Sequence, residues 1–159
     1  MPTKSAPPTL KELEAAEKAL RLVEQQQVLA QPHRNGSRSP LRSSALGRFV
    51  EDYRCGSLCF DAGEQYQILV YKWRKANGIP QSYNIVEFHG NGGDLDPNRI
   101  KEWKNRINDC NKSMATVGTV AYLATLALIL DDKEPLDLLA ARIKQALTNL
   151  GVNLGLIRE

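Results

Sequence analysis

The sequence has little of what catalysis and metal binding require. Its 159 residues include two histidines and three cysteines, and no nucleophile stands with a base at a recognised spacing. Cys55 and Cys59 lie four residues apart with His89 downstream, but structural zinc takes four ligands, usually in two close pairs, and the sequence has no second pair. We therefore expect no metal, no cofactor and no enzymatic activity, although separated acids such as Asp131 and Asp132 can still converge on folding.

The sequence also lacks an apolar run long enough to span a bilayer. The stretch Met114 to Leu130 carries no charge, yet it is shorter than the about 20 apolar residues that a spanning helix needs. It also contains three threonines and a glycine. We predict instead a helix buried on most of its faces at the centre of the domain. The start, Met1-Pro-Thr-Lys, lacks the apolar stretch of a secretory signal, so we expect a cytoplasmic protein with reduced thiols and no membrane partner.

Charge of one sign is scarce as well. There are 21 Lys and Arg against 18 Asp and Glu, which leaves a net charge of +3. This excess does not by itself imply a nucleic-acid partner, but it is compatible with one. A hydrophobic fraction of 42% with 25% charged residues is typical of a globular domain with one core.

Residues 1–31 predict an N-terminal helical arm. Thr9 can cap a helix, and the apolar or small positions that follow recur in alternating three- and four-residue steps. This heptad pattern predicts a coiled coil that forms a homo-oligomer through Leu13, Leu20 and Val23. The alternative is that the same side chains lie on the body of their own chain.

Residues 32–44 (PHRNGSRSPLRSS) predict a basic flexible linker, because two prolines, a glycine and several serines oppose helix and strand. Arg34, Arg38 and Arg42 recur in it with no acid among them. Arginines spaced along an unstructured segment can neutralise phosphates, so these three are candidate nucleic-acid contacts. The alternative is a solvated linker kept soluble by its charge.

Residues 45–159 predict a mainly α body, a compact helical bundle. A short helix from Ala45 is followed by a turn, in which Ser57 is placed to cap a second helix that runs to a stop at Gly78. The basic end of that second helix suits the helix dipole. It is also a candidate phosphate-contacting patch in which Trp73 is available for stacking. The cations of this patch are Lys72, Arg74 and Lys75.

The second half of the body begins with residues 82–88, the one strand-like segment, which predict a short hairpin or an irregular loop. Asp96 then caps a helix that starts with Pro97. Pro135 opens a last helix that ends at Gly151, after which the apolar tail folds back onto the body. One face of this last helix carries Leu136, Leu139, Ile143, Leu147 and Leu150. Arg142 and Lys144 lie off that stripe and are further candidate nucleic-acid contacts.

Two pieces of the body resemble a family of small helical proteins from alphaproteobacterial genomes and their prophages. The first piece combines Leu46-Gly47-Arg48 with Asp61-Ala62-Gly63 and Tyr66. The second piece is the segment 141–147 leading to Leu154-Gly155-Leu156. Together they cover about a third of the chain. The resemblance implies that the closing helix is similar to the recognition helix of a sigma-factor-like helix-turn-helix, and hence DNA binding and transcription control.

This sequence departs from that pattern between Leu130 and Ala140. A helix-turn-helix has a short positioning helix before the recognition helix, and here there is room only for a turn. The positioning helix is therefore missing, or the long apolar helix takes its role.

The residues and the resemblance together predict a nucleic-acid-associated regulatory protein of phage or prophage type that binds mainly through phosphate contacts. The alternative is a non-enzymatic protein–protein interaction subunit, such as a phage assembly or packaging protein, that oligomerises through its N-terminal helix. Whether DNA, RNA or a protein is the partner stays open at this level.

Overall fold

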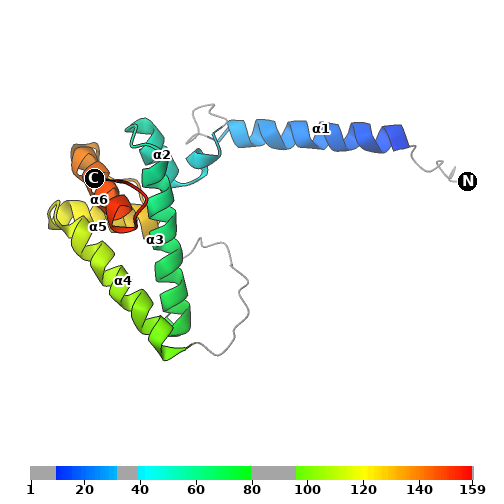
Figure 1. Cartoon of the computed structure of the whole chain (residues 1–159). Coiled ribbons are helices and arrows are strands. Elements are labelled where there is room, and N and C mark those ends of the chain that lie inside the picture. Colours follow the sequence, from blue (N-terminus) through cyan, green and yellow to red (C-terminus); the bar gives the residue numbers. More distant parts are fainter. Residues whose placement is uncertain (1–9, 32–38, 80–95, 159) are drawn as a thin grey trace, which may run out of the picture. The chain divides into compact units, whose positions relative to one another are not determined.

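The computed structural model describes residues 10–31, 39–79 and 96–158. Within these ranges all regular structure is helical, with six α-helices and no strand (Figure 1). The prediction of a mainly α protein is thus confirmed. The chain divides into two compact units, residues 1–40 and 41–159. The predicted hairpin or loop at 82–88 lies outside the described residues, as do Thr9 and His89.

The described part of the first unit is mostly helix α1 (Leu10–Leu29), which confirms that the predicted arm is helical. Leu20, Leu22 and Val23 are exposed, with 64%, 52% and 49% of their surface accessible. The side chain of Leu13 lies outside the described residues. These exposed side chains give α1 the apolar surface that a coiled coil needs. The coiled coil itself stays a prediction.

The second unit opens with a 3-10 turn, η2 (Pro40–Ser43), followed by α2 (Ala45–Asp52). The linker was predicted to be irregular up to Ser44. This is wrong for residues 40–44, which form the turn η2 and the cap of α2. Ser44 instead caps α2, its hydroxyl accepting a hydrogen bond from the amide of Gly47 at 3.0 Å. A Cβ at Gly47 would lie 1.6 Å from the carbonyl oxygen of Leu41, so only glycine lets η2 pass so close to α2.

Helix α3 (Ser57–Ala76) packs against α2 through another glycine. A Cβ at Gly63 would lie 2.4 Å from a methyl group of Leu46, so the leucine of α2 rests where α3 has no side chain. Ser57 does not cap this helix as expected. The cap is Gly56, whose φ of +89° favours glycine, and Ser57 is the first helical residue.

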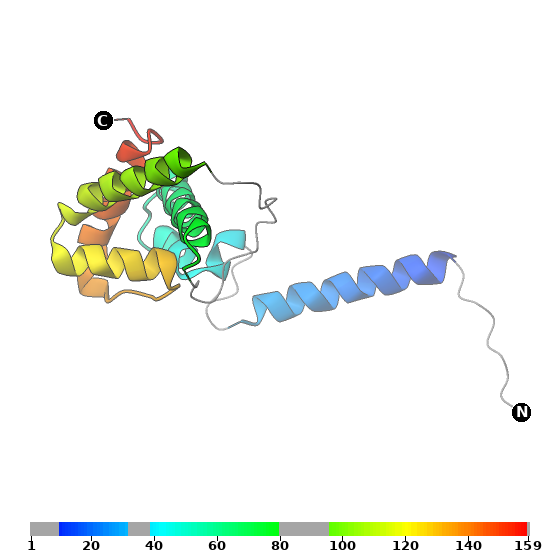
Figure 2. The ribbon, with the colours of Figure 1, turned by 90° about the horizontal axis from the view of Figure 1, so that it is seen from below.

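Helix α4 (Pro97–Ala115) begins as predicted. The carboxylate of Asp96 accepts a hydrogen bond from the amide of Asn98 at 2.9 Å, and Pro97 occupies the first helical position. A hydrogen bond of 2.6 Å from the hydroxyl of Tyr66 to the side-chain oxygen of Asn111 joins the middle of α3 to the second half of α4. The two helices run in opposite directions, so the end of α3 lies beside the start of α4 (Figures 1 and 2).

The uncharged span after Lys112 is not the central helix that the sequence predicts. It breaks at Gly118, whose φ is +103°, and resumes as α5 (Thr119–Leu130). On α5, Val120 and Leu123 are 67% and 56% exposed. Absence of charge therefore did not indicate burial on most faces, because α5 packs on the bundle along one side only.

The helix at the centre of the bundle is α6 (Ala140–Asn153), which packs against α3, α4 and α5. Ile143, Leu147 and Leu150 are fully buried in it, as the predicted stripe requires. The helix starts later than expected, because Leu136 has an extended backbone and is 67% exposed. A 3-10 turn, η3 (Asp137–Leu139), precedes it.

The end of α6 also differs from the prediction, since Gly151 lies inside the helix. The turn is made by Gly155, with a φ of +75°, and the amide of Leu156 donates to the carbonyl of Gly151 at 2.8 Å. A Cβ at Gly151 would lie 2.5 Å from the Cδ1 of Ile157. The tail thus packs back onto the core, which confirms that part of the prediction.

Within the described ranges, no helix is both long enough and apolar enough to cross a membrane. No three His, Cys, Asp or Glu side chains of the same residues gather closely enough to hold a metal ion. Cys55, Cys59 and Cys110 are free thiols. Burial raises the pKa of the Cys55 and Cys110 thiols to about 11, so both remain protonated at neutral pH.

Candidate nucleic-acid interface

Arg42, one of the arginines assigned to the linker, belongs to the body. It is 8% exposed, and its Nη1 lies 2.6 Å from the Oδ1 of Asp52 and 3.5 Å from the Oε2 of Glu51. The hydrogen bond to Asp52 raises the pKa of the guanidinium above its ordinary value. Arg42 is therefore a buried structural cation, and its interpretation as a phosphate contact is corrected. Arg34 and Arg38 lie outside the described residues.

The polar positions of α6 are largely engaged within the bundle. Arg142 is exposed, as expected for a contact. Lys144 is exposed too, but its Nζ donates to the backbone carbonyls of Tyr53 at 3.5 Å and Arg54 at 3.3 Å, where α2 ends. This hydrogen bonding satisfies two carbonyls of the turn that follows α2. Sequence alone did not reveal this role, because the partners lie 90 residues earlier.

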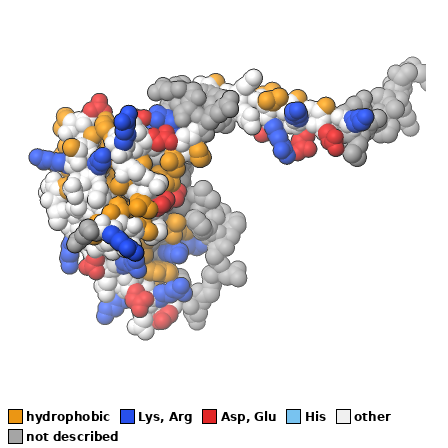
Figure 3. Space-filling model, turned by 45° about the horizontal axis from the view of Figure 1, so that its top comes forward, with side chains coloured by type: hydrophobic (Ala, Val, Ile, Leu, Met, Phe, Trp, Pro, Cys, Tyr) orange, Lys and Arg blue, Asp and Glu red, His pale blue; other side chains and the backbone are white. Residues whose placement is uncertain are grey.

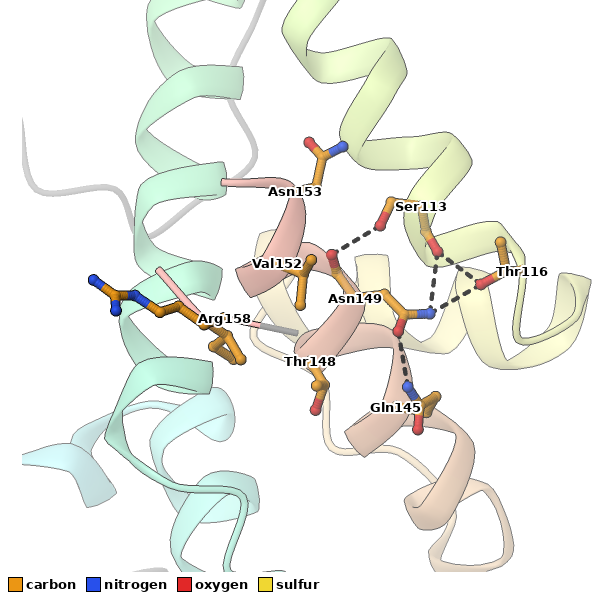
Figure 4. Close-up of a pocket in the computed structure, with 9 residues that line it drawn as sticks. Ser113, Thr116, Gln145, Thr148, Asn149, Val152, Asn153 and Arg158 are labelled. Carbon is orange, nitrogen blue, oxygen red and sulfur yellow. Dashed lines mark hydrogen bonds between the residues drawn. The ribbon is translucent and has the colours of Figure 1, made fainter. Parts of the chain in front are cut away.

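The face of α6 toward α4 forms an open polar pocket of about 490 Å³. The side-chain amide of Asn149 donates to the carbonyl of Ser113 at 3.4 Å and to the hydroxyl of Thr116 at 2.9 Å (Figure 4). The amide of Gln145 donates to the Oδ1 of Asn149 at 2.8 Å. These hydrogen bonds join the two helices. The same side chains are therefore not free to contact base edges in a groove.

The cations near the C-terminus of α3 differ from these engaged residues. Lys72 and Lys75 are exposed and Arg74 is half-buried. The ammonium of Lys75 lies 5.9 Å from the centre of the Tyr71 ring. These cations occupy the last two turns of α3, the part of the helix that lies beside the start of α4 (Figures 1 and 2).

Helix α4 adds cations at the same end of the bundle. Arg99, Lys101 and Lys104 are exposed on its first two turns. The guanidinium of Arg99 lies 5.7 Å from the centre of the Trp103 ring. The sequence did not assign these cations to a site, because only the antiparallel packing of α3 and α4 brings the two groups of cations to one end.

We call this cluster the basic end, and it consists of Lys72, Arg74, Lys75, Arg99, Lys101 and Lys104. In the part of the chain that the structure describes, none of these six cations forms an ion pair. Arg42 and Arg48 of the same body are both paired with acids, Arg48 with Glu134. Figure 3 shows Lys and Arg side chains at the lower end of the body, with some acids among them. The cations of the basic end thus differ from Arg42 and Arg48, whose charges are neutralised by acids around α2.

Comparison with protein-family models, with curated proteins and with solved structures found no match. The resemblance to the prophage family thus rests on its motifs alone. Two of them have a packing role here, since Gly47 lies against Leu41 and Gly63 lies against Leu46.

Proposed function

We propose that this protein is a nucleic-acid-associated regulator of phage or prophage type, and that it binds mainly through phosphate contacts made by the basic end. The observation that supports this proposal is the set of six cations without an ion pair among the described residues, gathered from two helices at one end of the bundle. Cations left without acids are those that can release counterions from a phosphate backbone. The proposal moves the interface away from α6, where Lys144, Gln145 and Asn149 are engaged within the bundle.

The test compares two triple variants with the same change in net charge. Lys72→Gln/Lys101→Gln/Lys104→Gln removes three cations of the basic end, and we expect affinity for a labelled oligonucleotide at low salt to fall by on the order of 10- to 100-fold. The slope of log affinity against log salt should become shallower by about 3, since each lost phosphate contact removes about one unit. Fluorescence anisotropy at several salt concentrations measures both quantities.

The control is Lys112→Gln/Lys133→Gln/Arg142→Gln, which lies outside the basic end and includes one of the two α6 cations that the sequence predicted as contacts. Because these side chains lie outside the proposed interface, affinity and salt slope should change much less than in the first variant. A larger loss in this control than in the first variant would place the interface outside the basic end. No binding of any oligonucleotide by the wild-type protein at low ionic strength would reject the function itself.

A second candidate function is supported by α1, where Leu20, Leu22 and Val23 are exposed. If the chain is an assembly subunit that oligomerises through the heptad seam, Leu20→Asp should convert an oligomer to a monomer, because it places a charge in that seam. Leu22→Asp is the matched control, since Leu22 is also exposed but lies off the seam. Light scattering of the two full-length variants measures the masses. Equal masses for wild type and Leu20→Asp would contradict this mechanism.

A further inference from the structure

The described aromatic side chains of the body differ in how they relate to the core, and Tyr53, Phe60 and Tyr122 pack against it while partly buried. Phe49 and Tyr66 are buried in the hydrophobic core, at 4% and 2% exposure. Tyr71, Trp73 and Trp103 are only half-buried and do not belong to the core cluster of described residues. These three rings lie on the same turns of α3 and α4 as the cations of the basic end. Both tryptophans of the sequence are among them.

Two of these rings already have a cation next to them. Lys75 lies 5.9 Å from the centre of the Tyr71 ring, and Arg99 lies 5.7 Å from that of Trp103. Such pairs hold a positive charge beside an aromatic face. A nucleotide has the complementary pair of features, a flat base joined to a phosphate. Aromatic rings interleaved with cations are the arrangement by which proteins hold unpaired nucleotides.

We propose that the basic end binds single-stranded nucleic acid, with bases stacking on Trp73 and Trp103 while the neighbouring cations contact the phosphates. This inference rests on the proposed function and names its ligand class. In a duplex the base faces are covered by their neighbours, and reading their edges requires a helix or ribbon that enters a groove. Helix α6, which the resemblance assigns to that role, packs against α3, α4 and α5, and the exposed Lys144 and Gln145 on it donate hydrogen bonds within the bundle. An unpaired strand offers its base faces without any such insertion.

The tryptophans make the test direct, because the sequence has only these two and both lie at the basic end. The full-length protein is titrated with a 20-nucleotide oligo-dT, an oligo-rU of the same length and a 20-base-pair duplex, while tryptophan emission is followed. We expect both single strands to quench the emission and to bind at least about 10-fold more tightly than the duplex. The DNA and RNA arms then distinguish the two sources of single strand.

Variants separate stacking from charge. Trp103→Ala should weaken single-strand binding by about 10-fold with little change in the salt slope, and Trp103→Phe should restore most of the affinity, since a ring is retained. Thermal melting of each variant checks that it is folded, and Trp73→Ala provides a second, independent measurement on the other helix.

The outcomes distinguish this inference from the function on which it rests. Equal binding of duplex and single strand, without quenching, overturns single-strand recognition and leaves phosphate-mediated binding intact. Absence of binding by all three oligonucleotides overturns both. Loss of affinity in Trp103→Ala that Trp103→Phe does not restore would also count against stacking.

Discussion

Replacing Gly47 with alanine is expected to lower the free energy of unfolding by about 3 kcal/mol, although the residue lies in a helix where intrinsic propensity favours alanine by about 1 kcal/mol. The added methyl group would lie 1.6 Å from the carbonyl oxygen of Leu41 and 2.4 Å from its carbonyl carbon. Both are backbone atoms, so no rotamer change can relieve the overlap. The turn η2 would have to move away from α2, and Arg42, which forms its ion pair with Asp52, lies in that turn.

Gly63→Ala is the matched comparison for this effect. Its Cβ would also be crowded, at 2.4 Å, but by the methyl group of the flexible Leu46 side chain. We expect a loss of about 1 kcal/mol, partly offset by the helix preference of alanine. Urea unfolding followed by far-UV circular dichroism measures both. A Gly63→Ala protein less stable than Gly47→Ala would show that the approach of η2 to α2 is not the tighter contact.

The second large effect concerns which apolar segment forms the core. Leu147→Ala, on α6, should lower the free energy of unfolding by about 3 kcal/mol, because a fully buried leucine leaves a cavity when it is truncated. Leu123→Ala, on α5, makes the same chemical change at a side chain that is 56% exposed. There the expected loss is below about 1 kcal/mol.

The same unfolding measurement compares the two leucine variants. If Leu123→Ala were the more destabilising, the apolar span after Lys112 would be the centre of the domain, as the sequence suggested. Similar losses for both would likewise contradict the arrangement in which α6 is enclosed and α5 lies at the surface.

Local signals in the sequence predicted the helices well where the cause was itself local. Asp96 and Pro97 mark the start of α4 because a cap and a fixed φ act within one turn. The stripe on α6 identified Ile143, Leu147 and Leu150 as core because it recurs at the helical period.

Features that depend on distant contacts were not predicted. Leu136 fits the apolar stripe by spacing, yet the chain is extended there and the side chain is exposed. The uncharged run after Lys112 was predicted to be buried on most faces, and this is wrong because burial depends on which surfaces cover the run. The run was also expected to form one helix, but the chain breaks the helix at Gly118.

The candidate site was predicted in part. The cations at the end of α3 were identified by their position in a last turn, but that position has a dipole explanation as well. The contribution of α4 needed the antiparallel packing fixed by the Tyr66–Asn111 hydrogen bond. Arg42 was misassigned because its acid partner Asp52 lies ten residues further along, at the end of α2, and because the linker composition did not indicate the turn η2.

The central position of α6 has a consequence for the order in which the body can fold during synthesis. Helices α2 to α5 leave the ribosome before α6, and the faces of α3, α4 and α5 that enclose it have no partner until it emerges. Translation therefore passes through a stage at which most of the body exists without its core, exposed to aggregation or to chaperones. The body can complete its fold only when α6, which is translated after the other helices of the bundle, has left the ribosome.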